Sequence, residues 1–396
     1  MTMFLSPIVY SFALLSSFFL IYLFAPQILL LDKNPSRISL HEELDDPILF
    51  KRALEPPPTP PPPTRKKISH FSTKSPSPKI AFLFLTNSDL TFYPLWERFF
   101  KRSTHLFNVY VHADPFAKVS VPNGIFKTQF IPSRKTQRGS PSLISAERRL
   151  LARAILDDPL NLYFALISQH CVPLHSFNYI YNTLFAPSIY HAFATQSRHK
   201  SFIEIISIDP NLQERYNARG ENMMLPEIPF DKFRVGSQFF ILAKRHALMV
   251  LQDKKLWGKF KIPCLNIDSC YPEEHYFPTL LSMKDPQGCS HYTLTNVNWT
   301  GSFDGHPYLY QAEEISPQLI YRLRQSNSSY SYLFARKFSP QCLKPLMNIA
   351  DDVIFRDKKK YQGYVDSFKK ERKEKQYLTI VRMQWKVLGA LGPSLH

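Results

Sequence analysis

The distribution of apolar residues predicts alternating strands and helices over the first half of the globular part of the chain. Residues 79–86 and 161–168 are apolar runs of strand length, typical of strands buried on both faces. The predicted strands cover residues 79–86, 107–115 and 161–168, and the predicted helices cover residues 94–100, 145–158 and 177–184, with Ser145 as a helix N-cap. This alternation predicts an α/β fold with a parallel sheet flanked by helices.

Residues 7–31 carry no charged side chain over about the length that a helix needs to span a bilayer. Residues 1–6 lack Lys and Arg, and the apolar run is long, so an uncleaved transmembrane signal anchor is favoured over a cleaved signal peptide. Residues 1–6 then form a short cytoplasmic tail. Lys33 and Arg37 follow the apolar run, and positive charge there argues against a lumenal C-terminus. The glycosylation sequons at Asn298 and Asn327, by contrast, can be used only if the main domain is translocated.

Proline-rich stretches follow the apolar run, at residues 55–63 and 75–79. Such stretches extend as polyproline rather than pack as helix or sheet. Residues 32–78 are therefore predicted to be a stem that holds a head away from a membrane, the alternative being a disordered linker of no further purpose. The head is expected to be a lumenal domain over residues 79–356, followed by a basic C-terminal tail over residues 357–396.

The formal net charge is +17, and the 396-residue chain has 44% apolar residues, enough for a globular core. Residues 357–396 hold ten Lys and Arg against four Asp and Glu, so most of the surplus lies elsewhere. No helix-turn-helix or RNA-reading motif accompanies it, and a phosphorylated substrate would equally favour a basic surface. We therefore expect no nucleic-acid partner, although binding of RNA or a membrane surface through the tail remains an alternative.

Five cysteines are few for a secreted scaffold, and three of them fall within residues 264–289. One or two local disulfides would suit an oxidising compartment. A structural zinc site needs paired Cys-x-x-Cys spacing, which is absent from the sequence, so no metal site is expected.

Polar residues follow the predicted strands at the edge where parallel sheets bind ligands. They are Thr86, Asn87, His112, Asp114 and residues 168–171. Neither Gly-x-Gly-x-x-Gly nor a Walker loop is present, and the chain has only 11 glycines. Phosphate, if bound, should therefore be met by cationic side chains.

Seven segments then follow one another in order: residues 79–115, 145–158 (SAERRLLARAILDD), 167–174 (ISQHCVPL), 215–228 (RYNARGENMMLPEI), 233–248 (FRVGSQFFILAKRHAL), 270–281 (CYPEEHYFPTLL) and 328–340 (SSYSYLFARKFSP). Together they resemble the Core-2/I-branching N-acetylglucosaminyltransferase-like family, in particular its plant branch. The resemblance covers about residues 79–345.

The resemblance implies a GT-A-like nucleotide-sugar-binding fold with a mixed, mainly parallel sheet, in a single-pass type II membrane enzyme of the Golgi. It also implies inverting transfer from a UDP-sugar to a hydroxyl of a glycan or glycoprotein, without a metal ion or other cofactor. The sequence contains no Asp-x-Asp motif, the usual cation holder in this fold. The sugar is N-acetylglucosamine in animal members, while plant relatives resemble users of glucuronic acid or another UDP-sugar.

The segment CYPEEHYFPTLL places two carboxylates before an apolar run. The resemblance implies that Glu274 is the general base that accepts the acceptor's proton. Glu273 takes the preceding acidic position, where orienting or capping is expected. Both are expected in a first helical turn, whose dipole favours the ionised form, so ordinary helix-start chemistry is the alternative.

The resemblance also implies contacts to the nucleotide and the sugars. Lys337 matches the phosphate-binding lysine, with Arg336 as an adjacent cation. His112 and Asp114 match a nucleotide-contacting region, although Asp114 before Pro115 is also a common turn residue. The remaining candidates for substrate binding are Gly236, Ser237, Gln238 and Trp299. The rings of Phe239, Phe240 and Trp299 are of the kind that stacks on sugars, with core packing as the expected alternative for each of them.

One position departs from the pattern of animal members, since Cys171 stands where some of them carry an aspartate. A buried small side chain or a bridge partner is the expected role of this cysteine. The departure leaves a non-catalytic, glycan-binding or scaffolding member of the same fold as the alternative function.

Overall fold

The structure, a computed structural model, describes residues 40–55, 77–185, 199–302 and 305–357. The predicted cytoplasmic tail and anchor (1–31), much of the predicted stem and nearly all of the basic tail lie outside the described residues. Within the described ranges, no helix is both long and apolar enough to cross a membrane.

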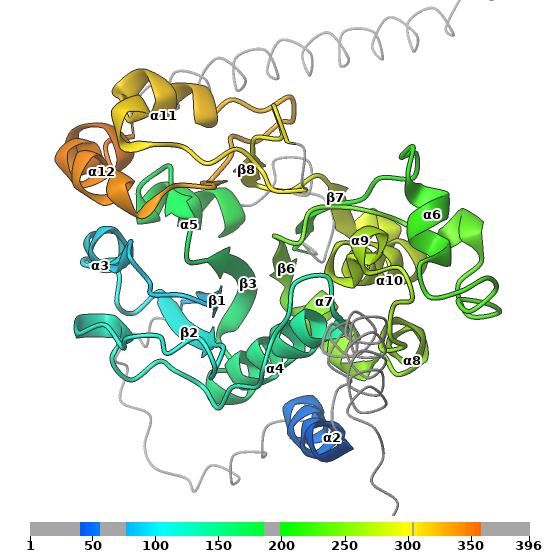
Figure 1. Cartoon of the computed structure of the whole chain (residues 1–396). Helices are drawn as coiled ribbons and strands as arrows, with labels where there is room; N and C mark the ends of the chain where they lie inside the picture. The colour runs from blue at the N-terminus through cyan, green and yellow to red at the C-terminus, as the bar shows by residue number, and fades with distance from the viewer. Residues whose placement is uncertain (1–39, 56–76, 186–198, 303–304, 358–396) are drawn as a thin grey trace, which may run out of the picture.

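A central sheet of six strands organises the described part of the chain (Figure 1). Its strands are, in spatial order, β2 (Phe107–Ala113), β1 (Lys79–Thr86), β3 (Asn161–Ser168), β6 (Ile241–Ala243), β5 (Ser201–Glu204) and β7 (Cys289–His291). β1 pairs in parallel with β2 and β3, and β5 pairs in parallel with β7. β6 is antiparallel to both β3 and β5. The predicted α/β fold with a mixed, mainly parallel sheet is confirmed.

Two of the three predicted strands, β1 and β3, have the predicted bounds, because each is an apolar run buried on both faces. Seven of the eight residues of β1 are buried, and so are seven of the eight residues of β3. β2 ends at Ala113, two residues before the predicted end, where the chain turns at Asp114.

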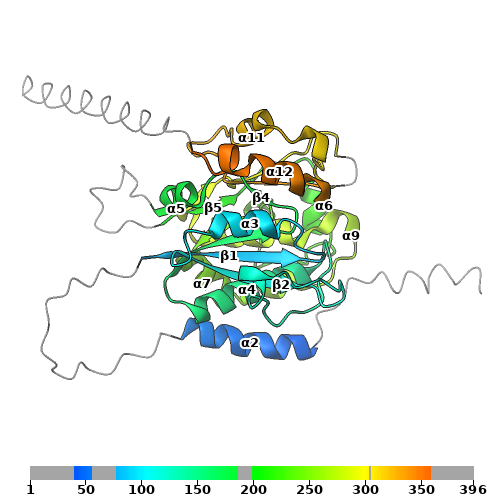
Figure 2. The same cartoon turned by 90° about the vertical axis from the view of Figure 1, so that its left-hand side faces the viewer.

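Helices cover both faces of the sheet. Figure 2 shows α3, α12 and α11 on one side of β1, and α4 and α2 on the other. The helices are α2 (Leu40–Leu54), α3 (Tyr93–Phe100), α4 (Pro141–Asp157), α5 (Phe177–Phe185), α6 (Leu212–Asn217), α7 (Lys244–Gln252), α8 (Lys255–Phe260), α9 (Ile267–Cys270), α10 (Tyr276–Lys284), α11 (Pro317–Leu323) and α12 (Leu343–Ile349).

Helix α4 begins four residues before the predicted start, so Ser145 is not its N-cap. Ser140 is the cap: its Oγ accepts a hydrogen bond from the Ser142 amide, and Pro141 occupies the first turn. Proline fits there because the amides of a first turn have no helical partner. Ser145 is buried inside the helix.

Aromatic rings fill the space between β1 and α3. Phe82 of β1 meets Trp96, Phe99 and Phe100 of α3 edge-on, with ring centroids 4.9–6.1 Å apart. Such pairs contribute about 0.5–1.5 kcal/mol each beyond their buried area. This packing holds β1 in place, and the candidate site begins at the end of that strand.

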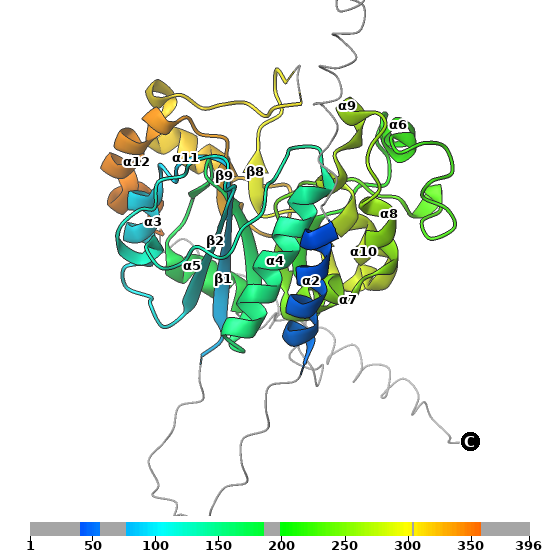
Figure 3. The ribbon, with the colours of Figure 1, turned by 60° about the horizontal axis from the view of Figure 1, so that its bottom comes forward.

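Helix α2 corrects the prediction that all of residues 32–78 is stem. Asp46 of α2 makes two contacts with Arg149 of α4, at 2.7 and 3.0 Å. Phe50 is buried, and the Arg148 guanidinium lies 4.8 Å from its ring and 5.0 Å from that of Trp257. Figure 3 shows α2 lying along α4. The prolines that flank this helix in sequence obscured its apolar stripe.

A cavity of about 850 Å³ lies between α2 and α8, lined by Phe50, Arg148 and Trp257 among others. None of the predicted site residues lines it.

A second, three-stranded sheet lies beside the first. Its order is β4 (Val172–Pro173), β9 (Phe334–Arg336) and β8 (Thr295–Val297). Because β4 follows closely after the end of β3, its pairing with β9 carries Arg336 to the carboxyl edge of the main sheet.

Candidate active site

The candidate site lies at the carboxyl edge of the parallel strands. β1, β3 and β5 end there at Thr86, Ser168 and Glu204. Because β6 runs in the opposite direction, the segment that leads into it, Gly236–Gln238, meets the same edge. The Gln169 side-chain amide donates to the Asn87 side chain at 2.7 Å, which joins the ends of β1 and β3 as predicted.

The two predicted carboxylates lie in a separate short turn before helix α10. A disulfide between Cys264 and Cys270 precedes it, Tyr271 takes a left-handed conformation (φ 34°, ψ 60°), and the 3-10 turn η4 (Pro272–Glu274) follows. The expectation that both glutamates occupy the first turn of the apolar helix is therefore wrong, since that helix begins at Tyr276. The Gly236 amide donates to the Glu274 carbonyl at 2.9 Å and fixes the turn to the sheet edge.

Glu274 is partly exposed and paired through one oxygen. Its Oε2 lies 2.8 Å from Nη1 of Arg215 on α6. Its side chain is 26% exposed, and Oε1 has no hydrogen-bond partner among the described residues. One carboxylate oxygen is thus open to a substrate hydroxyl.

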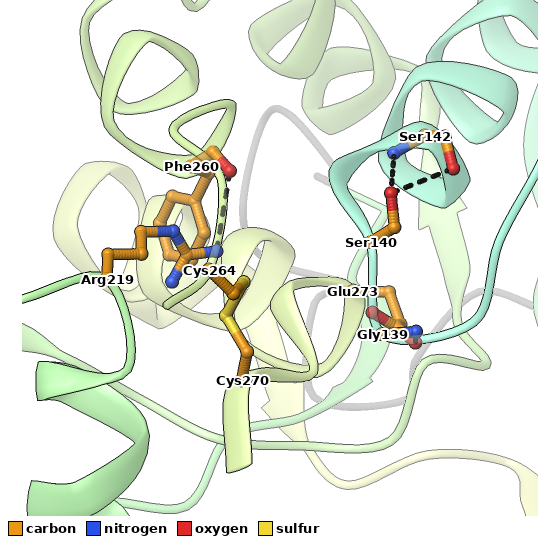
Figure 4. The surroundings of a disulfide bond; sticks show 8 residues. All are labelled: Gly139, Ser140, Ser142, Arg219, Phe260, Cys264, Cys270 and Glu273. Atoms are coloured by element: carbon orange, nitrogen blue, oxygen red, sulfur yellow. Dashed lines mark hydrogen bonds between the residues drawn. A yellow bond between two sulfur atoms is a disulfide. The ribbon is translucent and has the colours of Figure 1, made fainter. Parts of the chain in front are cut away.

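Glu273 points the other way, into the protein. Its Oε1 accepts a hydrogen bond from the Gly139 amide at 3.0 Å, and Figure 4 shows the two residues side by side near the disulfide. Its Oε2 is buried without a partner in the described part of the chain. Burial, with help from the nearby negative charge of Glu274, raises the pKa of Glu273 to about 7. Burial thus outweighs the backbone hydrogen bonds that favour the ionised form of Glu273.

A third acid supports the same edge from α4. Glu147 is fully buried and accepts a hydrogen bond from the Gln238 side-chain amide at 2.7 Å. Burial raises the pKa of Glu147 well above its ordinary value, and the charge of Glu273 adds to the shift. The predicted substrate residue Gln238 is thus held by a buried acid.

Gly236 and Ser237 are held by the end of β5. The Ser237 amide donates to the Glu204 carboxylate at 2.9 Å. A Cβ at Gly236 would lie 2.1 Å from the Glu204 carbonyl oxygen, so only glycine fits at this position. Burial raises the pKa of Glu204, and the charge of Glu274 adds to the shift.

Arg336 supplies positive charge at the end of β9. Its guanidinium lies 4.3 Å from the centroid of the Phe239 ring, and its Nε is buried without a hydrogen-bond partner among the described residues. Burial lowers the pKa of Arg336, and Cys171 and Glu274 oppose this shift. Glu274 and Arg336 are therefore close enough for their charges to interact.

Lys337 lies beside His170, at the end of β3. Burial lowers the pKa of His170 to about 4, and the charge of Lys337 contributes to the shift. The structure thus brings Lys337, the predicted phosphate-binding lysine, and the adjacent cation Arg336 to the edge that carries Glu274. Cys171 is buried and free, not bridged.

His112 and Asp114 are engaged within the protein. His112 is buried, and its Nε2 accepts from the Arg134 amide at 3.2 Å. Burial lowers the pKa of His112 to about 4, so the ring is neutral. The Asp114 carboxylate accepts from the amides of Phe116 and Thr136. Both side chains shape the loops after β2, and a contact to a nucleotide stays a prediction.

Trp299 and the two sequons lie on the surface of the described residues. Trp299 is 51% exposed. Asn298 donates to the Tyr310 hydroxyl at 3.3 Å, while Asn327 is exposed.

Three residues near Glu274 were not predicted as site residues: Arg215, Tyr271 and Arg138. Arg215 and Tyr271 lie in segments that carry the family resemblance, yet nothing in the sequence indicates that they meet. Contacts across 59 residues, as between Arg215 and Glu274, become visible only in three dimensions.

The described residues contain no group of three or more His, Cys, Asp or Glu side chains arranged to hold a metal ion.

Comparison with known proteins assigns the family. The sequence profile of the Core-2/I-branching enzymes matches residues 80–324, more than half of the chain. The chain belongs to this family. Among curated proteins, glycosyltransferase BC10 of rice (Oryza sativa subsp. japonica) is similar to it, with 28% identity over 312 residues that cover 66% of this chain and 74% of the rice protein. The resemblance noted from the sequence is confirmed, and this member of the Core-2/I-branching family is a glycosyltransferase.

Proposed function

We propose that this Core-2/I-branching enzyme has a GT-A-like fold and transfers a sugar, with inversion, from a UDP-sugar to a hydroxyl of a glycan or glycoprotein. One observation supports the proposal most directly. Glu274 has one carboxylate oxygen without a partner among the described residues, and it lies close enough to Arg336 for their charges to interact. A base and a cation at one edge of a sheet are what this reaction requires.

In the proposed step, the acceptor hydroxyl oxygen attacks the anomeric carbon and its proton passes to Oε1 of Glu274. The bond between that carbon and the UDP oxygen breaks, and UDP leaves with the electron pair. Arg336 and Lys337 stabilise the charge that develops on the diphosphate, a role that a divalent cation has in other enzymes. Attack opposite the leaving group inverts the anomeric centre.

The test uses the full-length chain in detergent with a panel of UDP-sugars, including UDP-N-acetylglucosamine and UDP-glucuronic acid, with and without a chelator. We expect turnover of one donor that the chelator does not reduce. Glu274→Gln keeps the shape of the side chain and removes its basicity, so transfer should fall about 10²–10⁴-fold. Glu55→Gln, at the exposed end of α2, is the matched control and should keep full activity.

Two outcomes would contradict the proposal. Unchanged transfer by Glu274→Gln would show that Glu274 is not the general base. Loss of turnover with chelator would show that a metal ion takes part.

We also propose that the enzyme is a single-pass type II protein of the Golgi membrane, anchored by residues 7–31. The support is the uncharged apolar run together with the sequons at Asn298 and Asn327. Treatment of the cell-made protein with an N-glycosidase should increase its gel mobility, and Asn298→Gln combined with Asn327→Gln should abolish the change. A chain that carries no glycan in either case would argue against a lumenal domain.

A further inference from the structure

Arg215 contacts Glu274 in a way that the proposed reaction does not by itself require. Its Nη1 lies 2.8 Å from Oε2 of Glu274, and the two side chains are 20% and 26% exposed. Among the described residues, the Arg215 guanidinium has no other hydrogen-bond or ion-pair partner. Within the described part of the chain, the polar contacts of the Arg215 guanidinium therefore go to the Glu274 carboxylate alone.

The Arg215 guanidinium is also held from a second direction. Its central carbon lies 5.3 Å from the centroid of the Tyr271 ring, within the range of a cation–π contact. Tyr271 is itself constrained, because it takes a left-handed conformation directly after the bridged Cys270. Arg138 lies over the same ring at 5.4 Å.

We propose that Arg215, backed by the Tyr271 ring, is a positioning residue that holds the carboxylate of Glu274 through Oε2 and leaves Oε1 directed to the acceptor hydroxyl. The inference rests on the proposed role of Glu274 as the base. Arg215 acts through Glu274 and takes no proton.

The geometry favours positioning over two other roles. An inhibitory arginine, which would have to move away before the reaction, would be expected to bond both carboxylate oxygens of Glu274. Arg215 bonds only one of them. A stabilising ion pair would be buried, whereas exposed pairs contribute little to the free energy of unfolding. The contact can change the orientation of the Glu274 carboxylate, which must lie close to the acceptor hydroxyl.

The test compares Arg215→Ala and Arg215→Lys with Arg153→Ala, an exposed arginine of α4, in the full-length chain. Because a small misplacement of the base is costly, Arg215→Ala should lower kcat about 10–100-fold, with a much smaller change in acceptor KM. Arg215→Lys should be intermediate, since a lysine keeps the charge without the planar fork. Added guanidinium at millimolar concentration should partly restore kcat of Arg215→Ala, and Arg153→Ala should match the wild type throughout.

Tyr271→Leu provides a second variant that keeps Arg215 itself. Without the aromatic face the guanidinium loses its backing, so part of the kcat defect should appear. A folded Tyr271→Leu protein with the wild-type kcat would limit the proposal to Arg215 and contradict the role of the ring.

The outcomes separate this inference from the proposed function. Normal or raised kcat in Arg215→Ala, together with inactive Glu274→Gln, would overturn the positioning role and leave the base in place. Normal transfer in Glu274→Gln would overturn both. A fall in kcat of Arg215→Ala that added guanidinium does not restore, together with a loss of stability, would show that Arg215 acts only on the fold.

Discussion

The Gly139 amide donates a hydrogen bond to the carboxylate of Glu273, and this bond joins the loop before α4 to the turn that carries Glu274. The acceptor is a buried acid whose second oxygen has no partner in the described part of the chain. Burial raises the pKa of Glu273, because a buried acid costs less free energy in its neutral form than in its charged form. The strength of the contact between the two segments therefore depends on pH.

Glu273→Gln should make the protein relatively more stable as the pH rises. The pKa of Glu273 is about 7 in the folded protein, above the ordinary 4.5. Stability from this group is full below about pH 4.5 and is lost as the pH rises to about 7, because the folded state then holds a proton that the unfolded state has released. Glutamine stays neutral, so the variant should gain up to about 3 kcal/mol relative to the wild type across this range.

Urea unfolding of both proteins at several pH values between 5 and 8 measures this difference. A constant difference in the free energy of unfolding across that range would show that Glu273 is ionised in the folded state already at low pH.

Gly236→Ala should destabilise the site edge. The new Cβ would lie 2.1 Å from the Glu204 carbonyl oxygen, which is backbone and cannot move aside cheaply. We expect a loss of about 1–3 kcal/mol in the free energy of unfolding, together with reduced transfer because the Gly236 amide holds the turn of Glu274. The control is Gly258→Ala in α8, where nothing lies within 4 Å of the added Cβ and a small gain is expected.

The disulfide between Cys264 and Cys270 should support the turn that follows it. Replacing both cysteines by serine should cost about 2 kcal/mol of stability, the amount expected for a short loop. Thiol titration under denaturing conditions should detect three thiols before reduction and five after it, because Cys171, Cys289 and Cys342 are free. Fewer than three before reduction would mean that a further bridge forms.

Asp46→Asn should loosen α2 without touching the chemistry. Asp46 and Arg149 have side chains only 13% and 7% exposed, so the variant leaves Arg149 with a nearly buried charge. We expect a loss of about 3 kcal/mol in the free energy of unfolding, with acceptor KM unchanged. Asp231→Asn, which breaks an exposed pair with Lys232, is the control and should unfold as the wild type does.

The sequence predicts the strands well where burial alone decides them. The bounds of β1 and β3 follow from apolar runs. One or two local disulfides were expected among the clustered cysteines, and the structure has one among the described residues. The three-residue strand β6 is too short to have a pattern, so its antiparallel direction could not be predicted.

The candidate site could be predicted only in part. Glu274, Arg336 and Lys337 were identified by family resemblance, and the structure brings them to one edge. The opposite burial of Glu273 and Glu274 was not predictable, because neighbouring residues of a 3-10 turn point in directions that only the surrounding packing fixes. Arg215 was missed since its partner lies far along the chain.

Helix α2 changes what the proposed anchor would imply. If residues 7–31 anchor the chain as proposed, only residues 32–39 separate the anchor from a helix that is docked on α4, a span of about 30 Å at most. The long proline-rich stretch follows that helix, and both of its ends join the same body, so its length would not set the distance of the enzyme from a membrane. A protease that cuts within residues 56–76 would then not by itself release the enzyme, because the contacts of Asp46 and Phe50 would hold the body to the anchored segment.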